Sequence, residues 1–294
     1  MASLYITVIL LCRVVQALFF KRSSLEIKNI PMLVKYTSFR NTISTALSII
    51  VLLICFNGFK CDILTFTFAF MSGISLFVCS AFGIYSVKFG TVSLNSMFST
   101  AGMLIPILAG LFFFNQPISP MQWAGLVLFF AAVYLLIQSS KKIYNGFSLK
   151  AFFLLMGSLV FNGTTMLSQQ LFTRYVPNGD VSVFSLISFS VPAVLGFLVF
   201  SFMPKKYKEN NETKISKSLI LCAFALAGAV FVINQLATLS TALVPPVILF
   251  TLINGGETII STIVAAVVYK EKLSVKSVIG VLLGITSFII IKAF

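Results

Sequence analysis

Apolar runs of about twenty residues recur along the whole chain and alternate with short polar segments. An α-helix of this length spans the hydrocarbon core of a bilayer, which is about 30 Å thick. The runs therefore predict an all-α integral membrane protein with ten transmembrane helices, and they leave little chain for a soluble domain. The predicted helices cover residues 3–20, 37–56, 63–87, 91–114, 121–137, 149–172, 181–203, 219–239, 245–269 and 275–291.

The charged residues lie mostly between the apolar runs and give the chain a formal net charge of +14. In a soluble protein such an excess would point to nucleic acid, but this distribution is typical of membrane topology, so we expect no nucleic-acid partner. Lys and Arg gather in the loops after the first, fifth, seventh and ninth runs. The positive-inside rule places these loops in the cytoplasm and both termini outside. The length, the short termini and the lack of a targeting segment favour a bacterial inner (plasma) membrane.

The residue types that usually bind metals and nucleotides are scarce. The chain has no histidine, and its five cysteines include no CxxC pair, so we expect no metal and no cofactor. It also lacks a GxxxxGK[ST] phosphate-binding loop. The sequence therefore predicts no ATP-binding site of this kind, and any energy input to this chain alone would come from a proton or solute gradient.

An internal repeat divides the chain into two similar halves. The segment 115–119 (Asn-Gln-Pro-Ile-Ser) matches 270–274 (Lys-Glu-Lys-Leu-Ser), and each copy is followed by a glycine, Gly125 or Gly280, at the same 155-residue offset. A second match pairs Gln16 with Gln169. The predicted halves are residues 1–139 and 150–294, joined by a basic linker over 140–149. Five helices in each half force opposite orientations, which is the inverted repeat of many secondary transporters.

The Glu-Lys-Leu-Ser turn at 271–274, followed by Gly280 in the last helix, resembles the EamA-type members of the drug/metabolite transporter superfamily. The five-plus-five helices and the total length match as well, so the resemblance covers the whole chain. Gln116 departs from the pattern, since it stands where the first half would carry the turn glutamate. The resemblance implies transport of a metabolite through a central cavity. Members move amino acids, sugars, nucleotide-linked sugars and organic cations.

Glu257 is the most informative residue, because it lies in the middle of an apolar run. A carboxylate at the bilayer midplane costs about 2.5–3.5 kcal/mol, and such residues usually mark a substrate or ion path. Glu257 could bind a proton or a cationic group and couple it to a conformational cycle, or it could be the structural partner of a basic side chain. Gly255 and Gly256 before it, and Pro106 in the fourth run, are hinge candidates.

Arg13 is the matching positive charge within the first run. It could bind an anionic substrate group, pair with Glu257 in one state of the cycle, or snorkel to the membrane surface. If Arg13 and Glu257 both line a cavity, a zwitterion such as an amino acid would fit between them.

Buried amides provide the remaining binding candidates. Side chains of this kind hydrogen-bond polar substrates, but they also hold membrane helices together. Arg40 and Asn41, near the predicted start of the second helix, are expected at the cavity mouth. The amides that fall within the predicted helices are Gln16, Asn95, Asn162, Gln169, Gln170, Asn234 and Gln235.

These features favour a secondary transporter rather than an enzyme. The transporter would move a small polar metabolite, such as an amino acid, by alternating access, and Glu257 would couple protons to this movement. The alternatives are an exporter of organic cations or an exchanger of nucleotide sugars or sugar phosphates. A channel and an intramembrane enzyme are less favoured, because the sequence has no filter pattern and no paired intramembrane carboxylates. Gly280 and Gly284 form a close-packing motif that could join a homodimer or pack within a monomer.

Overall fold

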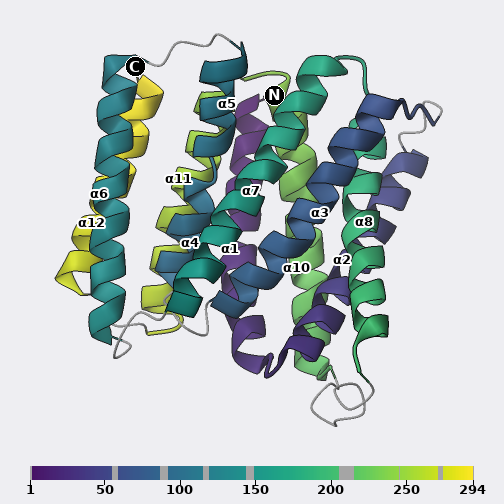
Figure 1. Cartoon of the computed structure of the whole chain (residues 1–294), viewed down its shortest axis with the longest axis horizontal. Helices are drawn as coiled ribbons and strands as arrows, with labels where there is room; N and C mark the ends of the chain where they lie inside the picture. Colours follow the sequence, from purple (N-terminus) through teal and green to yellow (C-terminus); the bar gives the residue numbers. More distant parts are fainter. Residues whose placement is uncertain are drawn as a thin grey trace.

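The computed structural model describes residues 2–54, 59–86, 92–114, 119–143, 149–204, 215–244, 246–270 and 274–293. Within these ranges all regular secondary structure is helical (Figure 1). The helices are α1 (Ala2–Glu26), α2 (Ile30–Ile54), α3 (Ile63–Ser86), α4 (Val92–Ala101), α5 (Leu104–Phe114), α6 (Pro120–Ile143), α7 (Leu149–Tyr175), α8 (Val181–Phe202), α10 (Lys217–Thr241), α11 (Pro246–Val267) and α12 (Val275–Ala293).

The side chains of this bundle are distributed as in a membrane protein. Large apolar residues such as Phe113 and Phe202 are exposed, whereas Arg40, Gln169 and Asn254 are buried. In the described part of the chain, helices α1, α2, α3, α7, α8 and α10 are each long and apolar enough to cross a membrane, and shorter apolar stretches lie in α4–α5, α6, α11 and α12. The chain is therefore a multi-pass integral membrane protein whose polar groups face inward, away from lipid.

Helices that are distant in sequence form the main packing pairs. α1 packs on α10, α2 on α8, α3 on both α7 and α8, and α4 on α11. Figure 1 shows α6 and α12 side by side at one edge of the bundle, where they also contact each other. The two ends of the chain lie at the same end of the bundle in this view.

The first two helices extend beyond their predicted ends. α1 continues to Glu26 and α2 begins at Ile30, so Lys21 and Lys35 lie within helices rather than in a loop. The prediction was wrong there because charged residues end an apolar run without ending the backbone hydrogen bonding. The turn between α1 and α2 contains Asn29, whose side-chain Oδ1 accepts a hydrogen bond from the backbone N–H of Met32 at 2.9 Å, as a helix N-cap does.

The predicted helix over 91–114 is two helices, with a break at Gly102 and Met103. Pro106 explains the position of the break, because proline has no N–H to donate to the carbonyl four residues earlier and its ring crowds that carbonyl. That carbonyl belongs to Gly102, which instead accepts from the N–H of Ile105 at 3.0 Å. The break therefore lies one turn before Pro106, which itself occupies the first turn of α5.

Candidate functional site

A polar cavity of about 120 Å³ lies in the middle of the bundle, with walls from α1, α2, α3, α4, α7, α10 and α11. Its walls therefore come from both predicted halves of the chain. All seven residues predicted from the sequence to bind substrate or ions line this cavity: Arg13, Gln16, Asn95, Asn162, Gln169, Asn234 and Glu257.

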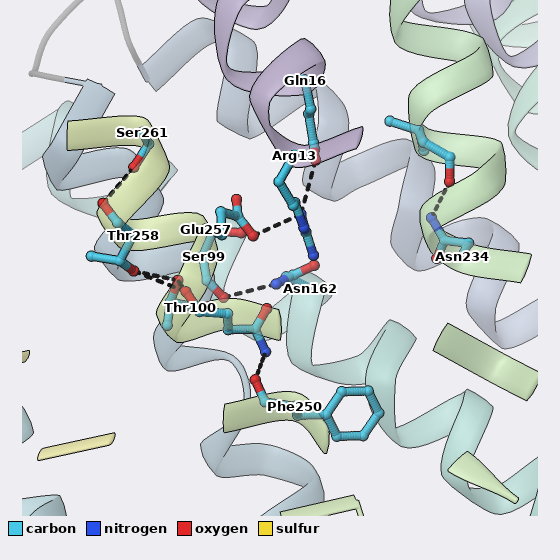
Figure 2. A network of polar contacts seen from close by, with 12 residues as sticks. Arg13, Gln16, Ser99, Thr100, Asn162, Asn234, Phe250, Glu257, Thr258 and Ser261 are labelled. Carbon is cyan, nitrogen blue, oxygen red and sulfur yellow. Dashed lines mark hydrogen bonds and ion pairs between the residues drawn. The ribbon is translucent and has the colours of Figure 1, made fainter. Parts of the chain in front are cut away.

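Arg13 and Glu257 form an ion pair across the cavity wall. Nη1 of Arg13 lies 2.6 Å from Oε2 of Glu257, and the two side chains are only 12% and 15% exposed. The same Nη1 donates to Oε1 of Gln16 at 2.9 Å, one turn along α1 (Figure 2). Of the three alternatives for Arg13, this conformation has the ion pair with Glu257. The two charges therefore neutralise each other in this conformation.

The amides of α7 connect this helix to its neighbours around the cavity. Nδ2 of Asn162 donates to the carbonyl of Ser99 at 2.8 Å, next to the break between α4 and α5. Nε2 of Gln169 donates to Oδ1 of Asn234 on α10 at 3.1 Å. The amides thus serve as links between helices while they line the cavity, so the two interpretations made from the sequence do not exclude each other.

The other predicted amides divide between the cavity and the packed interior. Asn95 lines the cavity and accepts a hydrogen bond from Ser86 at 2.7 Å. Gln170 and Gln235 are not among the lining residues, and Gln235 accepts a hydrogen bond from Ser185 instead.

One cavity residue escaped the sequence-based prediction, and another lies deeper in its helix than expected. Arg40, expected at the cavity mouth near the start of the second helix, lies ten residues into α2 and lines the cavity. Asn254, one turn before Glu257, also lines the cavity, and its Oδ1 is buried without a hydrogen-bond partner in the described part of the chain. The spacing of Asn254 and Glu257, three residues apart on one helix face, was the signal that could have identified it.

Hydrogen bonds also join α4 to α11 beside the cavity. The hydroxyls of Thr100 and Thr258 are 3.0 Å apart, and Thr100 donates to the carbonyl of Asn254 at 3.3 Å. Figure 2 shows this pair to the left of the ion pair, with Ser261 above Thr258 on α11. The end of α4, just before the break between α4 and α5, is therefore hydrogen-bonded both to α11, through Thr100, and to α7, through the carbonyl of Ser99.

The glycine hinge candidates lie in an unbroken part of α11. Gly255 is buried, and a Cβ at Gly256 would collide with the side chain of Leu10 on α1. In this conformation Gly256 allows α1 and α11 to approach closely, which brings Arg13 within reach of Glu257. The backbones of Gly102 and Gly163 approach in the same way, since a Cβ on Gly102 would lie 2.7 Å from the nitrogen of Gly163.

The segments that carry the resemblance to EamA-type transporters are only partly described. Residues 115–118 and 271–273, which include Gln116 and the turn glutamate, lie outside the described residues. Gly280 and Gly284 on α12 are both buried within the bundle of a single chain.

The cavity offers charge recognition and hydrogen bonding. Two guanidinium groups and one carboxylate are among its lining residues, together with six amide side chains. Among the described residues no group of three or more His, Cys, Asp or Glu side chains could hold a metal. Such a wall suits reversible binding of a polar solute.

Comparison with known proteins finds a similar fold but gives no information on function. No family model and no curated protein matches the sequence. A solved structure, described only as the crystal structure of a protein, shares the fold with a TM-score of 0.67 and 16% sequence identity. The match covers 98% of this chain and 95% of that one. The class that the fold and the site define is a multi-pass membrane protein with a polar cavity enclosed by its helices.

Proposed function

We propose that this protein is a secondary transporter of the drug/metabolite type, which carries a small polar metabolite by alternating access. The observation that carries the proposal is the central cavity, whose wall contains an arginine and a glutamate from the middle of two apolar helices. Burying charges in a membrane protein is unfavourable, so they usually remain where substrate or ions pass. The EamA-type resemblance of the sequence supports the same class.

The packing of the helices supports two repeated halves. If α1, α2, α3, α4–α5 and α6 correspond in order to α7, α8, α10, α11 and α12, the pair α1–α10 corresponds to α7–α3. The pair α3–α8 corresponds to α10–α2, and α1–α11 to α7–α4; every one of these pairs is in contact. The pairs α2–α8, α4–α11 and α6–α12 correspond to themselves. A contact pattern unchanged by this exchange is expected of two repeated halves, and five membrane spans in each half would make the repeat inverted.

Individual residues support the repeat as well. Gln16 and Gln169, which match in the two halves, both line the cavity, one from α1 and one from α7. At the 155-residue offset, Glu257 corresponds to Gly102, the residue at the helix break. One half thus carries the charge where the other carries the irregular backbone. The two sides of the cavity would therefore differ in chemistry, with the carboxylate on one side and the helix break on the other, although the two halves share a fold.

The mechanism proposed is rocking of the two halves about the cavity. α1 and α11 separate or approach as the site opens to either side, and the ion pair between Arg13 and Glu257 forms or breaks with them. Protonation of Glu257 would release Arg13 and so couple a proton to the cycle. The basic ends of the helices opposite the termini would face the cytoplasm of a bacterial inner membrane.

The size of the cavity favours a compact solute. An apolar cavity of about 150 Å³ accommodates benzene, so about 120 Å³ suits a molecule of similar size. A nucleotide sugar exceeds this volume in the present conformation. Small metabolites such as amino acids and short organic acids therefore fit the proposal best.

Uptake and counterflow in proteoliposomes test the function. We expect saturable uptake of at least one solute from a panel of amino acids, organic acids, sugars, sugar phosphates and organic cations, with acceleration by unlabelled solute on the opposite side. Glu257→Gln should lower the initial rate at least tenfold and abolish stimulation by a pH gradient.

Asp180→Asn provides the matched control, because it is also a carboxylate-to-amide change. Asp180 caps α8 by accepting from the N–H of Ser182 at 2.7 Å, and asparagine caps helices equally well. This variant should transport normally. Flux that does not saturate would indicate a channel, and chemical conversion of a solute would indicate an enzyme; either result would contradict the proposal.

A further inference from the structure

Arg40 is a deeply buried cation on the cavity wall. Its side chain is 2% exposed, and it extends from the middle of α2. Nη2 donates to the hydroxyl of Ser80 on α3 at 2.7 Å and to Oδ1 of its neighbour Asn41 at 3.2 Å. Nε is buried and has no hydrogen-bond partner among the described residues. The guanidinium is therefore held in place by neutral groups and remains only partly satisfied.

No carboxylate of the described chain compensates this charge. Glu257 pairs with Arg13, and Glu26 accepts from two serines at the start of α10. Asp62 and Asp180 accept from backbone N–H groups at the starts of α3 and α8. The remaining acidic residues, Glu209, Glu212 and Glu271, lie outside the described residues.

Among its described lining residues, the cavity consequently has one positive charge in excess. Arg13 and Arg40 both line it, but the one carboxylate in this set, Glu257, is already paired with Arg13. A buried cation without a counter-ion is strongly unfavourable in a low-dielectric interior, so it is usually retained for an anionic partner. A solute that brings a negative charge would supply the missing counter-ion.

We propose that Arg40 is the anion subsite of this cavity, and that the solute carries a carboxylate or phosphate group. The guanidinium suits both groups, because its planar donors match two oxygens at once. Ser80 accepts from Arg40, which leaves its own O–H proton available to donate to the same anion. The inference rests on the proposed function, since it names the class of solute carried. It also disfavours organic cations, which would add to the positive charge.

The first test compares chemically paired ligands on the purified wild-type protein. Thermal unfolding is measured with lactate against lactamide, alanine against alaninamide, and glycerol phosphate against glycerol, at matched millimolar concentrations. Binding to the folded state raises Tm by mass action. We expect the anionic member of at least one pair to raise Tm clearly more than its neutral or cationic counterpart. The carboxylate and phosphate pairs distinguish the two kinds of anion.

The second test removes the charge. Arg40→Gln should abolish the difference between the paired ligands, and Arg40→Lys should retain it at lower affinity, because lysine keeps the charge without the planar donors. Arg22→Gln is the matched control, since Arg22 is half-exposed near the end of α1, away from the cavity. It should leave the difference between the ligands unchanged.

The ligand-free proteins separate a binding role from a structural one. If Arg40 awaits an anion, Arg40→Gln removes an uncompensated charge and should leave Tm unchanged or raise it by about 2 °C. A structural role would lower Tm instead. Wild-type protein that binds amides as well as acids, a lowered ligand-free Tm of Arg40→Gln, or an undiminished preference for anions in Arg40→Gln would overturn the inference.

Uptake measurements keep the two proposals apart. Saturable transport of neutral or cationic solutes without preference for anions would leave the transport function standing and remove the anion subsite. Anion binding that depends on Arg40, in a protein that transports none of these solutes, would leave the subsite standing and remove the transport function.

Discussion

Arg13 and Glu257 face each other from the midpoints of α1 and α11, with 2.6 Å between Nη1 and Oε2. The pair joins the first helix to α11, more than 240 residues further along the chain. It exists because Gly256 leaves space for Leu10, so that the two helix backbones can approach. A buried ion pair of this kind contributes little net stability, but loss of either partner leaves an isolated charge in the interior.

Single neutralisations of this pair should therefore be more harmful than the double one. Arg13→Gln and Glu257→Gln should each lower stability by about 3–5 kcal/mol, because each leaves the other charge unpaired. The double variant should recover most of this loss, since two neutral amides can hydrogen-bond to each other. Thermal or denaturant unfolding of the four proteins in one detergent measures the coupling. Additive effects of the two changes would show that the charges do not interact.

The close approach of Gly102 and Gly163 gives a second prediction. A Cβ on Gly102 would lie 2.7 Å from both the nitrogen of Gly163 and the carbonyl oxygen of Leu159, and both contacts are to backbone that has little freedom to move. Gly102→Ala and Gly163→Ala should each destabilise the protein by about 1–3 kcal/mol through overpacking.

Gly228 on α10 provides the control for these substitutions, because a Cβ there would have no neighbouring atom within 4 Å. Gly228→Ala should be neutral or stabilising by up to about 1 kcal/mol, as expected for alanine inside a helix. If Gly102→Ala behaves like Gly228→Ala in thermal unfolding, the backbones of α4–α5 and α7 are not in the contact described.

A third prediction concerns the link between the end of α1 and the start of α10. The carboxylate of Glu26 accepts from the hydroxyl of Ser216 at 2.7 Å and from that of Ser218 at 2.5 Å. Ser216 also caps α10 through the N–H of Leu219, so Ser218 is the cleaner probe. A double-mutant cycle of Glu26→Ala and Ser218→Ala should give a coupling of about 1 kcal/mol in unfolding free energy.

Thr7 serves as the uncoupled reference, since among the described residues its hydroxyl donates within α1, to the carbonyl of Ser3. Thr7→Ala combined with Glu26→Ala should give additive losses. A vanishing coupling for Ser218 as well would mean that the carboxylate is satisfied by solvent and that α1 and α10 are joined by apolar packing alone.

The sequence predicted the helices and the cavity residues better than it predicted the backbone details. Glu257 and Arg13 were identifiable because a charge inside an apolar run is expensive and therefore conspicuous. Arg40 was expected near a helix end because Lys35 placed the predicted start of the second helix at residue 37, whereas α2 begins at Ile30. The break at Gly102 was not predicted, since Pro106 indicates a disturbance without specifying which turn absorbs it.

The partners of these residues depended on packing between distant helices, which no local pattern records. The sequence offered Glu257 as one of three alternatives for Arg13, because both are charges within apolar runs, but it could not choose among them without knowing that α1 meets α11. Likewise, predicting the hydrogen bond between Gln169 and Asn234 requires knowing that α7 packs against α10. The proposed repeat limits the arrangements of helices but does not fix the distances between side chains.

Two adjacent glutamines on α7 give the last prediction, because only one of them reaches the cavity. Gln169 lines the cavity and bonds to Asn234, whereas Gln170 is buried outside it and its Oε1 has no hydrogen-bond partner among the described residues. Gln169→Ala should lower the apparent affinity for the transported solute by roughly tenfold, the effect of losing about one hydrogen bond. Gln170→Ala should leave affinity unchanged and alter only thermal stability. Concentration-dependent uptake by the two variants measures the difference, and equal losses of affinity would place the solute elsewhere.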